Sequence, residues 1–364
     1  MSASPAKDRL QSIQLLRAFA ALFVVVLHSY TRTLAAQPDA GPSISSLFAL
    51  SGNAGVDLFF VISGYIMFHV HHDDFGKGRS GSFLLKRLIR IAPIYWILST
   101  VALLVIVFVP SMFVVPRTLD PLWIAGSYLF FPVEYAPSLN TPLLQVGWTL
   151  NYEAYFYLVL AAFLFLPRRI AVVGITLLFV GSVAVGMMRP FAHPWPQMLT
   201  SWLLLEFLLG GFIALVQHAS GNRFRTAHLA GLAVGLVLLA ASFPMGRLDE
   251  DVTRFVFWGL PSVLIVNGVC RLRYEPKGWF GRAFVTLGDA SYSIYLVQVF
   301  SLPAAALVLG RLGILTGAPI DVNVILLTVA TALAGWLTWR IVERPLTRWL
   351  RRTLEPREPR AVTP

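Results

Sequence analysis

The chain has 364 residues, of which 57% are hydrophobic and 13% charged, and its mean hydropathy is +0.70. One soluble core of this length does not need so many apolar residues, so the composition excludes an ordinary soluble domain and indicates a membrane protein. The net charge of +11 would point to nucleic acid only if the basic residues gathered on one face.

Apolar runs fill the chain almost from end to end, and a helix of about 20 such residues crosses a bilayer. Proline, glycine and charged residues divide these runs into ten predicted spans. The spans are expected at residues 13–33, 54–70, 93–115, 150–167, 170–188, 198–217, 226–243, 253–270, 288–310 and 322–341. The predicted fold is all-α, a polytopic membrane bundle of about ten helices over residues 1–350, and residues 351–364 are expected to form a disordered cytoplasmic tail.

The basic residues alternate with the predicted spans. If the N-terminus lies in the cytoplasm, 23 of the 29 Lys and Arg residues fall in cytoplasmic segments and 6 on the opposite side. The positive-inside rule then predicts that both termini are cytoplasmic. Because membrane orientation alone accounts for the positive charge, no nucleic-acid partner is expected.

The first predicted span carries Arg17 and His28, eleven positions apart. Eleven residues make about three helical turns, so both side chains face one side of the helix, about 16 Å apart along its axis. A titratable group deep in a bilayer costs about 3 kcal/mol or more, which makes both residues candidates for function. In the alternative interpretation, Arg17 extends to the cytoplasmic interface and His28 makes a structural hydrogen bond.

Two carboxylates begin the second and fourth predicted spans on the outer side of the membrane. Asp57 enters at a depth comparable to that of His28, and could orient or charge-stabilise its imidazole. Glu153 is a second candidate partner for His28, or an acceptor for a substrate hydroxyl. It could instead be an interfacial carboxylate, which the helix dipole favours at a helix start.

Arg87 and Arg90 lie one turn apart on a predicted cytoplasmic helix that runs into the third span at Pro93. Two guanidinium groups at this spacing can hold a phosphate or diphosphate with paired hydrogen bonds. The same residues would equally serve as cytoplasmic anchors on anionic lipid headgroups.

The other clusters predict no separate catalytic site. One cytoplasmic loop contains the residues His69, His71, His72, Asp73 and Asp74. The loop offers no defined scaffold, so no metal site is expected there.

Residues 116–149 form an outer segment rich in proline and aromatic residues, which suits either a lid over a substrate or an interfacial aromatic belt. The single cysteine, Cys270, excludes an intramolecular disulfide.

Taken together in chain order, six segments resemble the acyltransferase-3 family of membrane acyltransferases, in particular the bacterial exopolysaccharide and lipopolysaccharide O-acetyltransferases. The segments are Leu16 to His28, Gly55 to Gly64, Arg87 with Arg90 before Pro93, Trp148 to Glu153, Leu287 to Leu296, and Val342 to Pro345. The resemblance covers nearly the whole chain, so residues 1–350 are identified as an acyltransferase-3 transmembrane domain. The sequence departs from the family at Gln298, where a histidine is frequent.

The resemblance implies an O-acyltransferase of the bacterial inner membrane. It would move an acyl group, usually acetyl, from cytoplasmic acyl-coenzyme A to a hydroxyl of an extracytoplasmic glycan such as exopolysaccharide or lipopolysaccharide. Acetyl-CoA is then the donor substrate, membrane lipids surround the chain, and neither a permanently bound cofactor nor a metal is expected.

Carried over residue by residue, the resemblance implies a role for each candidate. His28 would be the general base or an acyl relay, with Asp57 or Glu153 holding its tautomer. The donor would contact three arginines, Arg17, Arg87 and Arg90. The predicted acceptor-binding residues are Trp148, Asn151, Tyr152 and Tyr292.

Two other functions remain open from the residues. A proton-coupled transporter of a polysaccharide precursor or lipid-linked sugar would also use intramembrane His, Asp and Glu, but it should show two symmetric halves, and the sequence has no such internal match. A signalling or structural membrane subunit would use the same polar groups to hold helices together.

Overall fold

The computed structural model describes residues 5–109, 119–134, 141–221, 223–246, 248, 251–272, 276 and 278–355. All regular elements within these residues are helical. The longer helices are α1 (Pro5–Ala36), α2 (Ala54–Val70), α3 (Ser80–Phe108), α5 (Trp148–Phe163), α6 (Arg168–Met188), α8 (Leu203–Ser220), α9 (Arg225–Ala241), α11 (Leu260–Val269), α12 (Gly278–Asp289), α13 (Ser291–Arg311), α15 (Ile320–Thr338) and α16 (Arg344–Leu354). The short ones are α4 (Pro121–Tyr128), α7 (Pro194–Leu199), α10 (Asp251–Arg254) and α14 (Ile314–Gly317).

Nine helical stretches in the described part of the chain are long and apolar enough to cross a membrane. The prediction of a polytopic all-α membrane bundle is therefore confirmed. The predicted span at 150–167 corresponds to α5, which has only 16 residues and is about 24 Å long, shorter than the about 30 Å of a hydrocarbon core. The cytoplasmic position of the termini stays a prediction.

The third predicted span continues from a helix that starts upstream of it. The sequence predicted a span from residue 93 and a cytoplasmic helix with Arg87 and Arg90 that runs into it, and α3 is one helix from Ser80 that contains Pro93 in its interior. Proline is tolerated inside membrane helices because neighbouring groups satisfy the backbone that it frees. The basic stretch with Arg87 and Arg90 therefore belongs to the same continuous helix as the apolar span. Residues 110–115 of the prediction lie outside the described residues.

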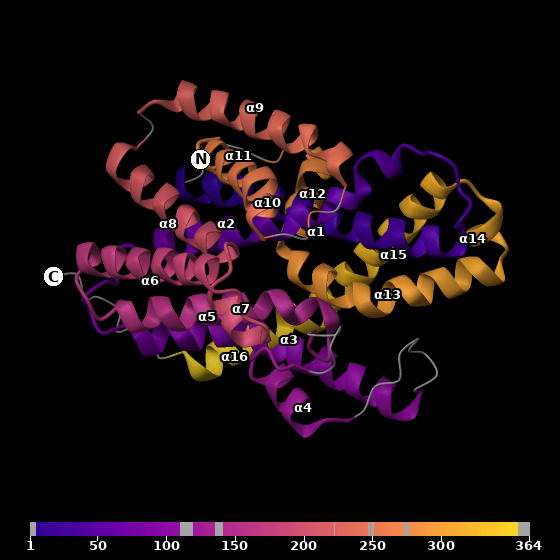
Figure 1. Ribbon diagram of the computed structural model, residues 1–364, viewed down its shortest axis with the longest axis horizontal. Helices are drawn as coiled ribbons and strands as arrows, with labels where there is room; N and C mark the ends of the chain where they lie inside the picture. Colours follow the sequence, from indigo (N-terminus) through magenta and orange to yellow (C-terminus); the bar gives the residue numbers. More distant parts are fainter. Residues whose placement is uncertain are drawn as a thin grey trace.

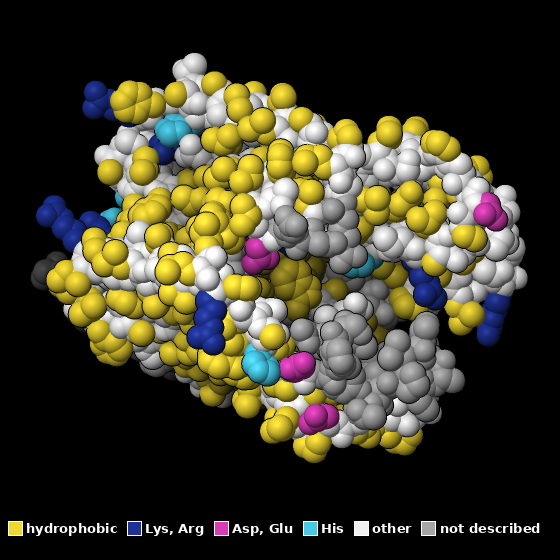
Figure 2. Space-filling view, viewed as in Figure 1, with side chains coloured by type: hydrophobic (Ala, Val, Ile, Leu, Met, Phe, Trp, Pro, Cys, Tyr) yellow, Lys and Arg dark blue, Asp and Glu magenta, His cyan; other side chains and the backbone are white. Residues whose placement is uncertain are grey.

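The helices form a bundle around α1. In Figure 1, α1 passes through the middle of the bundle, α9 forms one edge and α4 the opposite edge. Helix α1 packs against α2, α12, α13 and α15, and α2 packs along α8. Apolar side chains cover much of the face shown in Figure 2, as expected for a chain that turns apolar residues toward lipid.

The α2–α8 interface depends on glycine. A Cβ added at Gly64 would lie 2.0 Å from the carbonyl oxygen of Phe207, and one at Gly210 would lie 2.1 Å from that of Val61. Glycines on both helices thus let the two backbones touch, as small residues do in membrane helix pairs.

We expect Gly64→Val and Gly210→Val each to destabilise the folded protein by about 1–3 kcal/mol or more, because the added methyl groups force the backbones apart. Thermal unfolding of the purified protein in detergent measures this. The matched control is Gly181→Val on α6, where an added Cβ meets nothing within 4 Å. Equal loss of stability in all three variants would contradict the packing argument.

Candidate active site

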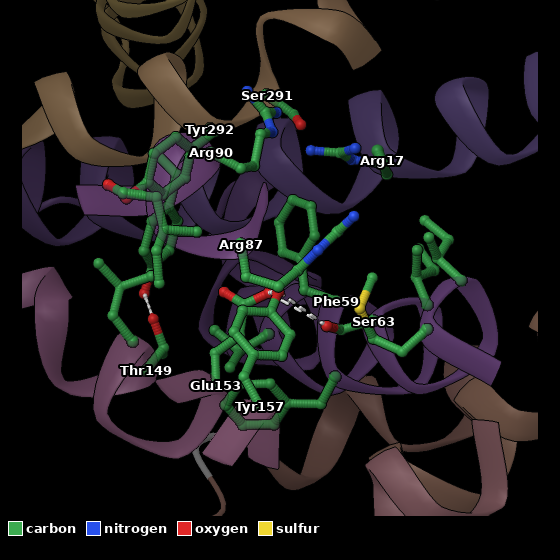
Figure 3. A pocket seen from close by; sticks show the side chains of 18 residues that line it. Arg17, Phe59, Ser63, Arg87, Arg90, Thr149, Glu153, Tyr157, Ser291 and Tyr292 are labelled. Atoms are coloured by element: carbon green, nitrogen blue, oxygen red, sulfur yellow. Dashed lines mark hydrogen bonds between the residues drawn. The ribbon is translucent and has the colours of Figure 1, made fainter. Parts of the chain in front are cut away.

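A cavity of about 150 Å³ lies among α1, α2, α3, α5 and α13. Figure 3 shows its lining, in which charged side chains meet in the middle of the bundle. The polar residues that matter most are Arg17, Ser63, Arg87, Arg90, Glu153 and Tyr292. Five of these six were candidates from the sequence, so the structure brings the predicted donor-binding arginines into one place. We call this space the inner cavity.

Two of the cavity's guanidinium groups form no direct ion pair within the described residues, although the Glu153 carboxylate lines the same cavity. Arg17 on α1 is half-buried and makes no hydrogen bond or ion pair with a described side chain. The Nε atom of Arg87 is buried without a hydrogen-bond partner in the same part of the chain, and its guanidinium lies 6.0 Å from the ring centre of Phe83. Figure 3 shows both groups directed into the inner cavity. An anionic or carbonyl-rich ligand would complete their hydrogen bonding.

Glu153 is held by two hydroxyl groups. Ser63 on α2 donates to its Oε1 at 3.0 Å, and Tyr157, one turn later on α5, donates to the same oxygen. Glu153 therefore lies in the inner cavity with a fixed orientation.

Arg90 is paired within the protein. Its guanidinium donates to Oε1 of Glu343, and the Ser293 hydroxyl donates to Oε2 of the same carboxylate at 2.5 Å. Glu343 is only 2% exposed and lies in a π-helical segment, Trp339–Glu343, between α15 and α16. The Tyr292 ring lies 5.5 Å from the Arg90 guanidinium, and its hydroxyl donates to the Ile91 carbonyl. The Arg90–Glu343 pair, with Ser293, thus connects α3 to α13 and to the junction of α15 and α16. The guanidinium groups of Arg17 and Arg87 remain available to a ligand.

Sequence reasoning missed Glu343 as a site residue, although it lies in one of the segments that carry the family resemblance. The available signal was a lone carboxylate directly after the last apolar run. Such a group needs a cation when it is buried.

Asp57 forms a second buried ion pair. Arg254 donates from its Nε to Oδ1 at 3.0 Å and from its Nη2 to Oδ2 at 2.8 Å, and Asp57 is fully buried. Arg254 also lies 5.7 Å from the ring centres of Trp148 and Trp258. Glu206, on α8, is fully buried and interacts electrostatically with both members of the pair. The sequence analysis did not identify Arg254 as the partner of Asp57.

His28 lies on α1 outside the lining of the inner cavity, and it is half-buried. Its Nδ1 is 3.0 Å from the carbonyl oxygen of Val24. A carbonyl only accepts hydrogen bonds, so Nδ1 carries the hydrogen and Nε2 of the neutral ring holds the lone pair that a base needs. The backbone of α1 thus orients the imidazole, a task that the sequence suggested for Asp57 or Glu153.

The predicted acceptor-binding residues lie in two places. Tyr292 lines the inner cavity. Trp148 and Tyr152 pack edge to face at the start of α5, with Trp148 facing Arg254. Asn151 is buried beside Trp123 and Ser127 in a small hollow behind α5. The structure therefore places Trp148 and Tyr152 beside the Asp57–Arg254 pair. Asn151 lies neither there nor in the inner cavity.

The histidine loop after α2 is held by local pairs. Nδ1 of His71 lies 2.7 Å from Asp74, which also accepts from Arg79 at 2.8 Å. Burial lowers the pKa of the His71 imidazole below its ordinary value. No three His, Cys, Asp or Glu side chains of the described residues are placed to hold a metal ion.

Comparison with known proteins identifies relatives along the chain. A family model described as an acyltransferase domain matches residues 10–339. The exopolysaccharide production protein ExoZ of Rhizobium meliloti (strain 1021) is 32% identical over 308 residues, which cover 82% of this chain and 90% of that protein. YrhL of Bacillus subtilis (strain 168), whose name gives peptidoglycan O-acetylation as a proposed activity, is 23% identical over 91% of this chain and 54% of its own length.

A further relative is the O-acetyltransferase OatA of Staphylococcus aureus (strain NCTC 8325 / PS 47), 22% identical over 92% of this chain and 56% of that protein. The chain thus spans most of ExoZ but only about half the length of YrhL and OatA. No solved structure matches it.

The Asp57–Arg254 pair generates a stability prediction. Arg254→Met leaves the Asp57 carboxylate buried without its cation, and we expect a loss of about 3–5 kcal/mol in unfolding free energy. The double variant Asp57→Asn with Arg254→Met removes the stranded charge and should recover most of that loss. Chemical or thermal unfolding in detergent measures both. Additive losses in the double variant would show that the two residues do not stabilise each other.

Proposed function

The chain belongs to the acyltransferase-3 family, an enzyme family that transfers acyl groups, and from this membership we propose that it O-acetylates a glycan at the membrane. The donor is acetyl-coenzyme A, or another acyl-CoA, supplied from the cytoplasm. The acceptor is a hydroxyl of an exopolysaccharide or related glycan on the outer side. The names of the relatives, which mention exopolysaccharide production and O-acetyltransferase activity, support this choice of acceptor and group. We assign the chain to the bacterial inner membrane.

The observation that carries the proposal is the pair of guanidinium groups in the inner cavity that form no direct ion pair within the described residues. Glu153, the carboxylate in the same cavity, is instead held by the hydroxyl groups of Ser63 and Tyr157, and the Nε atom of Arg87 is buried without a hydrogen-bond partner. Two cations beside one carboxylate inside a membrane bundle are unfavourable unless a ligand completes the site. The phosphates and the pantetheine carbonyl groups of an acyl-CoA supply the acceptors that these cations require.

The chemistry needs a base for the acceptor hydroxyl. Nε2 of His28 would take the hydroxyl proton while the sugar oxygen attacks the thioester carbonyl. The carbon–sulfur bond then breaks, and the coenzyme A thiolate leaves and takes up a proton. The products are the acyl ester and free coenzyme A, and no other reactant is needed. The pantetheine arm, about 15–20 Å when extended, matches the about 16 Å between Arg17 and His28 along α1.

Glu153 fits a positioning role in this scheme better than a role as the partner of His28. Its carboxylate lies with Arg17 and Arg87 in the inner cavity, whereas His28 lies outside the cavity lining. A carboxylate beside two arginines keeps them in place before the donor arrives.

The alternative function is proton-coupled transport of a polysaccharide precursor or lipid-linked sugar. A transporter has no need of an acyl thioester. Binding of acetyl-CoA therefore separates the two functions, and the structure indicates which arginine to change for this purpose.

Arg87→Gln is expected to weaken acetyl-CoA binding by about tenfold or more, because a charge-assisted hydrogen bond to the donor is lost. Isothermal titration of the purified protein measures it. Arg87 makes no ion pair with a described carboxylate, so its removal should leave the unfolding temperature nearly unchanged. Arg90 is unsuitable for this test, since its loss would strand Glu343.

The control for this experiment is Arg169→Gln, an exposed arginine at the start of α6. It should bind acetyl-CoA as the native chain does. If the native chain binds no acyl-CoA, the proposed reaction is wrong.

His28→Ala is expected to abolish the ester-linked acetyl groups that the native chain adds to cell-surface polysaccharide, because no base remains for the acceptor hydroxyl. The measurement is the acetyl ester content of polysaccharide from a deletion strain complemented with either form. Acetyl-CoA binding should persist, since His28 does not line the inner cavity. Unchanged ester content at normal protein level would refute the role of His28.

A further inference from the structure

Helix α16 presents a row of arginines whose function the proposed reaction does not yet explain. Arg344, Arg348, Arg351 and Arg352 lie on this helix, which forms the C-terminal end of the last candidate membrane-spanning stretch, Ile320–Leu354. At 100° per residue, all four fall within an arc of about 100° and so share one face. The helix packs against α3, which carries Arg87 and Arg90. We call this surface the arginine face of α16.

Two hollows that share lining residues lie between the arginine face and the inner cavity. A first hollow is lined by Arg344, Arg348 and Arg352, with Trp349. A second hollow shares Arg344 and Arg348 with the first, and also reaches Arg17. Arg17 in turn lines the inner cavity. Shared lining residues therefore lead from α16 to the centre of the bundle.

Most of this positive charge is not neutralised by the protein. Arg351 lies 3.6 Å from Glu355, and Arg344 stacks over the ring of Trp339 at 5.1 Å. Arg348 and Arg352 are exposed and make no ion pair within the described residues. The acidic groups of the second hollow are Asp289 and Glu343, of which Glu343 is already bonded to Arg90. The hollows therefore favour a ligand with several negative charges.

The volume of the inner cavity limits which part of an acyl-CoA donor it can hold. Its about 150 Å³ is below the roughly 300–1,000 Å³ of pockets that enclose whole cofactor-sized ligands. A slender pantetheine arm fits such a space, while a nucleotide does not. The nucleotide end of the donor must then lie outside the cavity.

We propose that the arginine face of α16 binds the phosphorylated nucleotide end of the acyl-CoA donor. The 3′-phosphate lies on Arg348 and Arg352, the diphosphate lies near Arg344 and Arg17, and the adenine stacks on the indole of Trp349. This indole is 60% exposed and lines the same hollow as Arg348, so its face is available to a base. The assignment rests on the proposed function, because it needs an acyl-CoA donor.

The phosphate of an anionic lipid headgroup has the same chemistry as the donor phosphates, and a basic helix beside a membrane can bind it. The hollow beside α16 shares the lining residue Arg17 with the inner cavity, and this favours the nucleotide end of the donor over a lipid headgroup. A headgroup has no reason to occupy a route that ends at Arg17 in the middle of the bundle. The experiment separates the two sources.

The test uses the full chain in nanodiscs of phosphatidylcholine, which carries no net charge. Arg348→Gln combined with Arg352→Gln should weaken acetyl-CoA binding by about tenfold or more, since two phosphate contacts are lost. Binding of S-acetylpantetheine, which lacks the nucleotide, should not change. Adenosine 3′,5′-bisphosphate should displace acetyl-CoA from the native chain, and Trp349→Ala should weaken that displacement.

The matched control removes two exposed arginines elsewhere, Arg169→Gln with Arg225→Gln, and should bind acetyl-CoA normally. If the native chain binds acetyl-CoA and the α16 double variant binds it equally well, the nucleotide lies elsewhere and the proposal is overturned. It is also overturned if the double variant loses only cosedimentation with phosphatidylglycerol vesicles, because the site is then a lipid site. Absence of acetyl-CoA binding by the native chain defeats the proposed function itself.

Discussion

A charge buried in a membrane bundle is stable only when another group compensates it, and this constraint shapes the centre of the molecule. Two ion pairs satisfy the constraint within the protein: Asp57 with Arg254, and Glu343 with Arg90. Two guanidinium groups, Arg17 and Arg87, form no direct ion pair in the described part of the chain. The first set connects distant helices, and the second set is the basis of the proposed donor site.

The internal pairs connect elements that are far apart in the sequence. Arg254 and Asp57 are 197 residues apart and tie α10 to the start of α2. Arg90 and Glu343 are 253 residues apart and tie α3 to the junction of α15 and α16, where Ser293 adds α13. A π-helical segment contributes to each pair, since one contains Glu343 and the other begins directly after Arg254. Such segments re-aim a side chain by one residue and occur often at functional sites. The walls around the inner cavity are therefore fixed by the same contacts that neutralise buried charge.

The sequence was sufficient to predict most of the fold and several of the charged residues that line the inner cavity, but not the pairing of the buried charges. Apolar runs located the spans because a membrane helix needs a continuous apolar stretch, and Arg17, Arg87, Arg90 and Glu153 were singled out because charge in or beside such a stretch is costly. Arg254 and Glu343 were not recognised because no local pattern indicates which distant residue neutralises a buried charge.

Helix α1 relates the two ends of the proposed reaction. It carries Arg17 in the inner cavity and His28 three turns later, and its own backbone orients the imidazole through the Val24 carbonyl. Because a helix is rigid over three turns, the distance from the proposed donor-binding cation to the proposed base is set by eleven residues of sequence rather than by loop conformation. Arginines of α16 line the same hollow as Arg17 on the side away from the inner cavity's other residues. In the proposed arrangement, a donor held at its nucleotide end on α16 and at Arg17 would present its thioester at a depth fixed by α1.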